Sequence, residues 1–376
     1  MLETISFPVY RESVAEYGSA EALSAACRAQ DCDGIEAVWG GDDALSQLPV
    51  GLVVGYHLMF YPDWVDFWNG SEGALLQKFG SRAAWTSFYG AENRAQFVAR
   101  YREDLRRAEL LQVRYVVFHV SDVSLEEAYT YRWLHGNRAV LDASLELLNL
   151  LLEDRSYCFE ILVENQWWPG FTFLDPSETD YLLRGIRTEK KGIVLDTGHL
   201  MNTNPALRSE ADGIQYLHTM LDRYGSLCGM IRGVHLHQSL SGAYVKGHTG
   251  MIPVWKSDGY LARFEQSYNH ILQIDRHQPW TDPRIVSVLR RIQPAYLTHG
   301  GYGRGPPFVL SGHRRKDRFL SAVRRHYHVG AGRHSRIRRR ATSDMAHSGA
   351  FPNGKGPERR SENHHQKRQP IFGFFL

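Results

Sequence analysis

Histidine and carboxylate side chains stand at the ends of several apolar segments of this 376-residue chain. Imidazole together with carboxylate suits Zn²⁺, Mn²⁺ or Fe²⁺, and no cysteine lies among them, which argues against a closed structural zinc site. A carboxylate that ends an apolar segment is costly unless something neutralises it. We therefore predict a centre that binds one to three divalent ions, with Zn²⁺ favoured over Mn²⁺. Where two ions bind, Glu164 is the carboxylate that could bridge them. The predicted ligands are His57, His119, Glu164, Asp196, His199, His235 and His248.

Each of these residues has a plainer interpretation when it is taken alone. A single buried histidine is more often a hydrogen-bonded core residue than a ligand, and an aspartate at the end of a strand often caps the next helix. The joint pattern favours a metal centre, with Glu164, Asp196 and His199 as the catalytic candidates. His237, two positions beyond His235, is expected to point away from the others.

Aromatic residues gather beside two of the predicted ligands. Trp167 and Trp168 either form a stacking platform for a substrate or pack against helices. Asn165 is expected to hydrogen-bond a metal ligand and orient it without binding the metal itself. The segment 56–68, YHLMFYPDWVDFW, carries six aromatic residues. It is either a lid or pocket wall, with Tyr56 in contact with the substrate, or a loop packed over the site.

Short apolar runs recur along the chain and predict eight strands. Most are dense in Val, Ile, Leu and aromatic residues without polar alternation, which is typical of parallel strands buried on both faces. The runs are 5–10, 34–39, 51–57, 114–120, 159–164, 192–196, 233–237 and 294–298.

Helical patterns separate these runs. In residues 91–111, Phe97, Tyr101, Leu105 and Ala108 fall on one face, with Arg and Glu opposite. Further helices are expected over 19–30, 137–153, 177–187, 206–224, 260–272 and 283–292.

Eight strands that alternate with helices predict a single-domain α/β fold, the (β/α)₈ TIM barrel. The carboxyl ends of its strands converge on one mouth, so the predicted ligands would face one another there. A doubly wound open sheet is the competing architecture. It usually carries a Gly-rich phosphate loop after the first strand, and the sequence SFPVYRES does not resemble one.

The charge of the chain is unevenly divided. Residues 301–376 carry 17 Lys and Arg against four Asp and Glu, and the whole chain has 44 and 41, so residues 1–300 have an excess of ten acidic side chains. An acidic body is a poor surface for duplex nucleic acid, so we expect a small-molecule substrate. We predict the barrel over 1–330 and a basic, disordered tail over 331–376, with a short last helix over 315–328.

Cellular location is predicted from what the sequence lacks. The four cysteines form no C-x-x-C pair, the first residues do not resemble a signal peptide, and no run of about 18 apolar residues occurs. A cytoplasmic, reduced protein outside the membrane is the expectation. The sequence makes no prediction of oligomeric state.

The strand ends resemble the xylose isomerase-like barrel superfamily, which includes endonuclease IV-type phosphodiesterases and sugar isomerases and epimerases. The resemblance covers about residues 1–300 and is carried by LVEN, LDTGH and VHLHQS. It implies that the Glu, Asp and His of these motifs bind metal. His57 and His119 match extra histidines of the three-metal phosphodiesterase branch. The stretch VENQWWPGFTF also resembles the cobamide-remodelling phosphodiesterases, which cut the nucleotide loop of vitamin B12-like cofactors.

Two positions depart from the pattern of that superfamily. The phosphodiesterase branch carries an Asp two residues before the His of the loop after strand seven, where this chain has Lys246. Both branches use a Glu at the end of strand eight, where this chain reads AYLTHGGYG. We hypothesise that the C-terminal sequence departs from the ancestral one from about residue 300, for instance by a frameshift. The chain would then lack one metal ligand and part of its barrel closure.

Three functions follow from these residues. The first is metal-dependent hydrolysis of a phosphodiester in a small or bulky-ring substrate, for which the cobamide nucleotide loop is the most specific candidate. The second is a divalent-metal-dependent sugar isomerase or epimerase, in which one ion binds two sugar oxygens and a pair of carboxylates moves the proton. The third is an inactive barrel that acts as a binding protein through its basic tail.

Overall fold

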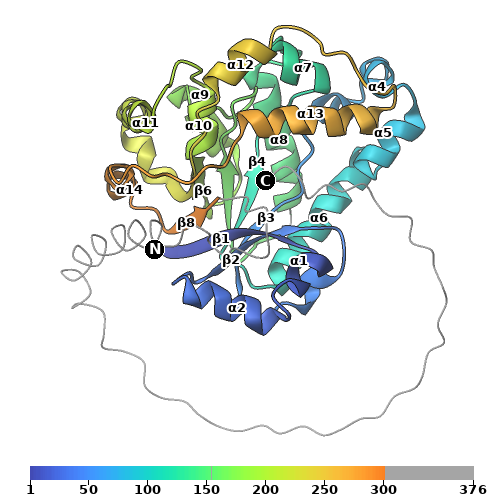
Figure 1. Cartoon of the computed structure of the whole chain (residues 1–376). Coiled ribbons are helices and arrows are strands. Elements are labelled where there is room, and N and C mark those ends of the chain that lie inside the picture. Colours follow the sequence, from blue (N-terminus) through green and yellow to red (C-terminus); the bar gives the residue numbers. More distant parts are fainter. Residues whose placement is uncertain (154, 301–376) are drawn as a thin grey trace, which may run out of the picture. The chain divides into compact units, whose positions relative to one another are not determined.

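Eight parallel strands form a closed barrel in chain order, which confirms the predicted (β/α)₈ fold. The structure is a computed structural model and describes residues 1–153 and 155–300. The strands lie at the centre and helices surround them (Figure 1). The strands are β1 (Leu2–Val9), β2 (Gly34–Trp39), β3 (Val53–His57), β4 (Tyr115–His119), β5 (Glu160–Glu164), β6 (Lys191–Asp196), β7 (Ile231–Leu236) and β8 (Tyr296–His299).

Barrel closure is complete within the described residues. Strand β8 pairs with β7 on one side and with β1 on the other, where Thr4 lies opposite Thr298. The first strand begins at Leu2, three residues before the predicted start, because the segment LET extends the pairing with β8. The expectation that the altered C-terminal sequence removes part of the closure is therefore wrong for the strands.

The seven predicted helices are present with ends that shift by a few residues. They bury the apolar faces that the sequence indicated; Phe97, Tyr101, Leu105 and Ala108 are all buried in α6. These helices are α2 (Ala20–Ala29), α6 (Arg94–Leu110), α8 (Asn137–Leu152), α9 (Pro176–Gly185), α11 (Glu210–Tyr224), α13 (Tyr260–Ile274) and α14 (Ile285–Ile292).

Shorter helices fill the connections between strands and were not predicted. Most have only five to eight residues, too few to show the periodicity of a helix clearly. They are α1 (Arg11–Ala15), α3 (Val65–Asn69), α4 (Glu72–Phe79), α5 (Arg82–Tyr89), α7 (Leu125–Thr130), α10 (Thr197–Asn202) and α12 (Gly242–His248), with 3₁₀ turns at Ala44–Gln47 and Gly225–Met230.

The aromatic segment 56–68 packs against the helix layer, which favours the packed loop over a lid. Tyr61 and Trp64 are 1% and 4% exposed, and both rings contact Phe97 of α6. Tyr56 is fully buried, and its hydroxyl donates a hydrogen bond to Asp104 of the same helix. The predicted contact of Tyr56 with substrate therefore does not fit, because neighbouring residues of a strand face opposite sides and it is His57 that faces the barrel interior.

Predictions for the basic C-terminal segment lie outside the described residues, including the last helix over 315–328 and the disordered tail over 331–376. Within the described part, no helix is long and apolar enough to cross a membrane.

A buried ionic cluster stabilises the connection between β3 and β4. The Lys78 ammonium lies 2.6 Å from an oxygen of Asp63 and 2.7 Å from one of Asp66, and its side chain is 11% exposed. Burial raises the pKa of Asp63, and burial together with the Asp63 charge raises the pKa of Asp122 to about 7. Lys78 is thus the cation that makes these ionised carboxylates tolerable inside the protein.

We predict that Lys78→Met lowers the free energy of unfolding by about 3–5 kcal/mol at pH 8, because it leaves buried charges unpaired. The loss should shrink as the pH falls, since the raised pKa values of Asp63 and Asp122 favour their neutral forms in the folded state. Urea denaturation at several pH values measures both effects. Lys256→Met, at an exposed position, serves as control, and equal losses in the two variants would contradict the prediction.

Candidate metal centre

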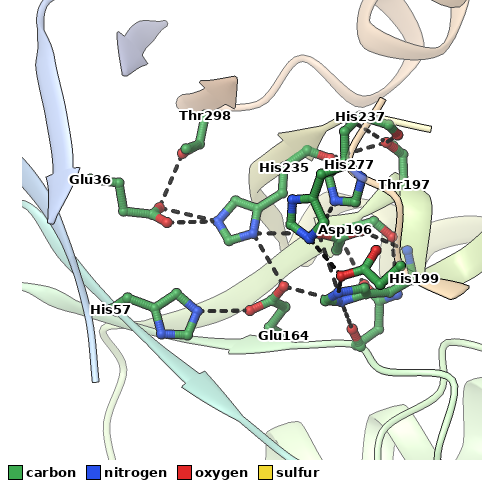
Figure 2. Close-up of polar contacts among 12 residues, drawn as sticks. Glu36, His57, Glu164, Asp196, Thr197, His199, His235, His237, His277 and Thr298 are labelled. Carbon is green, nitrogen blue, oxygen red and sulfur yellow. Dashed lines mark hydrogen bonds and ion pairs between the residues drawn. The ribbon is translucent and has the colours of Figure 1, made fainter. Parts of the chain in front are cut away.

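Three groups of metal-ligand side chains lie together in the barrel, and Figure 2 labels His57, Glu164, Asp196, His199, His235, His237 and His277 of them. Within each group the ligand atoms lie within 4.8 Å of one another. Six of the seven predicted ligands belong to these groups, and they come from segments far apart in the sequence. The groups are His57–His119–Glu164, Glu164–Asp196–His235 and His199–His237–Asp275–His277.

The first group joins β3, β4 and β5. Nε2 of His57 and Nε2 of His119 lie 3.2 and 2.8 Å from Oε2 of Glu164. Nδ1 of His57 lies 3.2 Å from the Leu58 carbonyl, so a neutral ring that donates to this carbonyl would direct the lone pair of its Nε2 toward the carboxylate. Burial lowers the pKa of His119 to about 4, which favours the neutral ring with one nitrogen lone pair available.

The second group joins β5, β6 and β7. Nδ1 of His235 lies 3.1 Å from Oε1 of Glu164 and 3.7 Å from Oδ2 of Asp196. Asp196 also caps helix α10, because its Oδ1 accepts a hydrogen bond from the backbone N–H of His199 at 2.7 Å. Asp196 thus caps the helix with one oxygen, while its other oxygen faces the second ligand group.

The third group contains residues that the sequence analysis missed. Asp275 and His277 follow helix α13, and Oδ2 of Asp275 lies 3.3 Å from Nε2 of His199 and 2.5 Å from Nε2 of His277. His237 stacks on His277 with ring centroids 4.0 Å apart. The sequence does carry a signal for this group. The segment IDRH has an Asp two residues before a His, which is the spacing that the phosphodiesterase branch has and that Lys246 and His248 lack.

The prediction that His237 points away is wrong. Residues two apart in an extended segment share a face, so His237 points to the same side as His235. Its Nε2 lies 2.7 Å from Oδ2 of Asp196, while its buried Nδ1 has no hydrogen-bond partner among the described residues. His237 therefore links the second group to the third.

His248 lies outside the three groups, so the structure does not bring it together with the other predicted ligands. It is exposed at the end of helix α12, its ring stacks on Tyr244, and its Nδ1 lies 2.9 Å from the Tyr244 carbonyl. The chain turns into a helix after β7 and returns to the centre only at Asp275. Distance along the sequence from a strand end does not reveal that return.

Residues 165–168 support the centre from outside. Asn165 donates to the Asp196 carbonyl at 3.1 Å and accepts from the Asp196 N–H at 2.8 Å, which agrees with its predicted supporting role. Trp167 and Trp168 are 7% and 2% exposed and belong to an apolar cluster. The Trp167 ring lies 5.1 Å from that of His199, so the pair forms a packed wall rather than an open stacking platform.

Strand eight contributes no carboxylate to the centre, as the sequence indicated. Thr298 lies opposite His235 in the β7–β8 register, and His299 contacts Glu3 at 3.4 Å. Glu36 of β2 provides a buried carboxylate beside His235 and Thr298 instead. It lies 3.1 Å from Nε2 of His235 and 3.0 Å from the Thr298 hydroxyl. The sequence analysis missed Glu36 because it lies inside an apolar strand rather than at its end.

Without ions the site is an ionic network. Burial opposes ionisation of Glu164 and Asp196, but the neighbouring histidines outweigh it and lower both pKa values. Burial likewise opposes the charge of His199 and His235, and the surrounding carboxylates raise the pKa of each well above 6.5. The carboxylates and the histidines thus favour one another's charged forms.

The donor set fits divalent metal ions. The ligands are imidazole and carboxylate without thiolate, which suits Zn²⁺ or Mn²⁺. The buried Nδ1 atoms of His119 and His237 have no hydrogen-bond partner among the described residues, which leaves each of them open to a ligand. The predicted divalent metal cofactor is consistent with this arrangement.

Comparison with solved structures returns other barrels at low identity. A D-tagatose 3-epimerase-like protein is 16% identical (TM-score 0.46; 87% of this chain and 100% of that chain covered). An L-ribulose 3-epimerase is 14% identical (TM-score 0.47; 89% and 100%), and the IOLI protein with a bound zinc atom is 12% identical (TM-score 0.42; 88% and 97%). No family model and no curated protein matches the chain. At these identities and TM-scores, no activity is transferred to this chain.

We predict that His277→Ala lowers the Zn²⁺ content of the purified, Zn²⁺-supplied protein by one equivalent, because it removes a ligand of the third group. His248→Ala is the matched control, since that histidine lies outside the groups, and it should retain the wild-type content. Elemental analysis of both variants decides between the two histidines. The reverse outcome would restore His248 as a ligand.

Metal binding should release protons and strengthen as the pH rises. The raised pKa values of His199 and His235 mean that both rings carry an extra proton near neutral pH, and ligation must displace it. Titration calorimetry of Zn²⁺ binding in buffers with different ionisation enthalpies measures the release. A heat that does not depend on the buffer would contradict this prediction.

Proposed function

We propose that this chain is a metal-dependent enzyme that hydrolyses a phosphodiester in a small or bulky-ring substrate. The observation that carries the proposal is the bridging position of Glu164. Its Oε2 faces His57 and His119, and its Oε1 faces His199 at 3.3 Å and His235 at 3.1 Å. One carboxylate thus serves two ligand groups with separate oxygens.

The residues place three binding groups side by side. Asp196 belongs to the second group and contacts His237 of the third. Divalent ions held there would supply Lewis-acid stabilisation of phosphoryl oxygens and a bound water of lowered pKa. The protein residues would hold the charges at fixed separations and shield them from bulk solvent, since Glu164 and Asp196 are almost wholly buried.

The substrate class rests on charge and on resemblance. The acidic body disfavours duplex nucleic acid and leaves small molecules as the expected partners. The nucleotide loop of a cobamide stays a prediction that rests on the stretch VENQWWPGFTF. Because Trp167 and Trp168 are packed in the core, they give no added support to a stacked ring substrate.

A sugar isomerase or epimerase is the second candidate. Glu164, Asp196 and His235 by themselves form a complete set for one ion. The names of the similar solved structures belong to this class, although those likenesses are too weak to argue from. Against it, the chemistry needs a second carboxylate beside the substrate, and Glu36 lies behind His235, with Thr298 at the strand-eight position.

The two candidates differ in their need for the first ligand group. We predict that the Zn²⁺- or Mn²⁺-loaded protein hydrolyses bis(p-nitrophenyl) phosphate or a cobamide, and that His119→Ala lowers kcat/KM by about 100-fold or more, because several kcal/mol of transition-state stabilisation are lost. His248→Ala should leave it unchanged. Ketohexose epimerisation that survives in His119→Ala, without phosphodiester hydrolysis, would favour the second candidate.

The binding-protein alternative has its own signature. A folded wild-type protein that takes up no Zn²⁺ or Mn²⁺ and turns over neither substrate class would overturn both enzymatic candidates. Metal uptake without turnover would reject the substrates tested and retain the metal centre.

A further inference from the structure

Glu36 is a buried carboxylate that belongs to none of the three ligand groups. It lies within β2 and is 1% exposed. The neighbouring strand carries Gly55 beside it in the register, and a Cβ at Gly55 would lie 2.3 Å from the Tyr115 ring. The glycine therefore makes room for Tyr115 to reach across the barrel, and the Tyr115 hydroxyl donates to Glu36 at 2.7 Å.

Three donors surround one oxygen of Glu36. Oε2 accepts from the Tyr115 hydroxyl, from the Thr298 hydroxyl at 3.0 Å and from Nε2 of His235 at 3.1 Å. Oε1 also lies 3.1 Å from that nitrogen. The carboxylate is thus held in place by groups from strands β4 and β8, and the imidazole of His235 faces both of its oxygens.

The His235 ring lies between Glu36 on one side and Glu164 and Asp196 on the other, as Figure 2 shows. Nε2 faces Glu36, and Nδ1 faces Glu164 at 3.1 Å and Asp196 at 3.7 Å. The two nitrogens of the ring therefore have different roles. One contacts an anion outside the ligand groups, and the other contacts the second ligand group.

We propose that Glu36 is the positioning residue of His235 in the metal centre. It accepts the Nε2 proton, which holds the ring in place and leaves the Nδ1 lone pair directed at the second ligand group. A carboxylate in this outer position also makes the imidazole a stronger donor to the metal. The inference rests on the metal centre of the proposed function but holds for either enzymatic candidate.

Other ligands of the centre show the same device with weaker partners. Nδ1 of His57 faces the Leu58 carbonyl at 3.2 Å, and Nδ1 of His199 faces the Asn165 carbonyl at 3.0 Å. A neutral carbonyl contacts each of these ring nitrogens, and Nδ1 of His199 also lies 3.1 Å from the side-chain amide nitrogen of Gln166 and 3.3 Å from Oε1 of Glu164. His235 differs because its outer partner is a carboxylate, so removal of that charge should change metal affinity.

Glu36 does not act as a ligand in place of the absent strand-eight glutamate. One of its oxygens already accepts from three donors, and the His235 ring separates it from Glu164. A direct ligand and a positioning residue make different predictions. Loss of a ligand abolishes one equivalent of metal, whereas loss of an outer partner weakens binding about 10- to 100-fold.

The first experiment compares Zn²⁺ affinity in Glu36→Gln and Glu160→Gln by competition with a chelator. Glu160→Gln is the matched control, because Glu160 pairs with Arg232 and belongs to none of the ligand groups. We expect Glu36→Gln to weaken one equivalent about 10- to 100-fold without loss of the others, and Glu160→Gln to bind like the wild type. Wild-type affinity in Glu36→Gln, or complete loss of one equivalent there while His235→Ala retains it, would overturn the proposal.

A second measurement uses the wild type and does not depend on how the variants fold. Long-range ¹H–¹⁵N spectra of the Zn²⁺-loaded protein report which ring nitrogen carries the proton, and His235→Asn identifies the resonance. We expect a protonated Nε2 and a metal-bound Nδ1. The opposite tautomer, or a wild-type protein that takes up no Zn²⁺, would overturn the inference. A metal-loaded wild type with this tautomer but no phosphodiesterase activity would reject the proposed function alone.

Discussion

A buried carboxylate at the centre of the barrel determines which side chains can surround it. Glu164 is fully buried, and a charge without partners there would cost far more than a single domain can spare. Histidines contact both of its oxygens. His57 and His119 contact Oε2, and His199 and His235 contact Oε1. Three of those rings have a further partner, which is Glu36 for His235, the Leu58 carbonyl for His57, and Asp275 together with the Asn165 carbonyl for His199. The polar core therefore spreads outward from one residue.

Parallel strand register brings these groups together. His119 lies opposite Glu164 in the β4–β5 pairing, and Asp196 lies opposite His235 in the β6–β7 pairing. Each pair therefore sits at one height although its members are far apart in the chain. The third group departs from this rule, because Asp275 and His277 come from the segment after helix α13.

The apolar packing around the polar centre offsets the free-energy cost of burying its charges. Large aromatic side chains fill the layer between strands and helices, as Trp64 and Phe97 do beside α6. Divalent ions that bind the folded state would add stability by mass action. The same burial that makes the charges costly also strengthens their effect on any ligand between them.

The sequence by itself determined the strands, the longer helices and most of the predicted ligands, because apolar periodicity is local and strand ends of a barrel converge. The tertiary structure decided the rest. It excluded His248, turned Tyr56 toward the helices, and brought in Glu36, His237, Asp275 and His277. Nothing local marks Glu36, since its role depends on Tyr115 and Thr298, which are distant in the chain and adjacent only once the barrel closes. Proximity across a closed sheet is a property of the whole fold, and no window of sequence contains it.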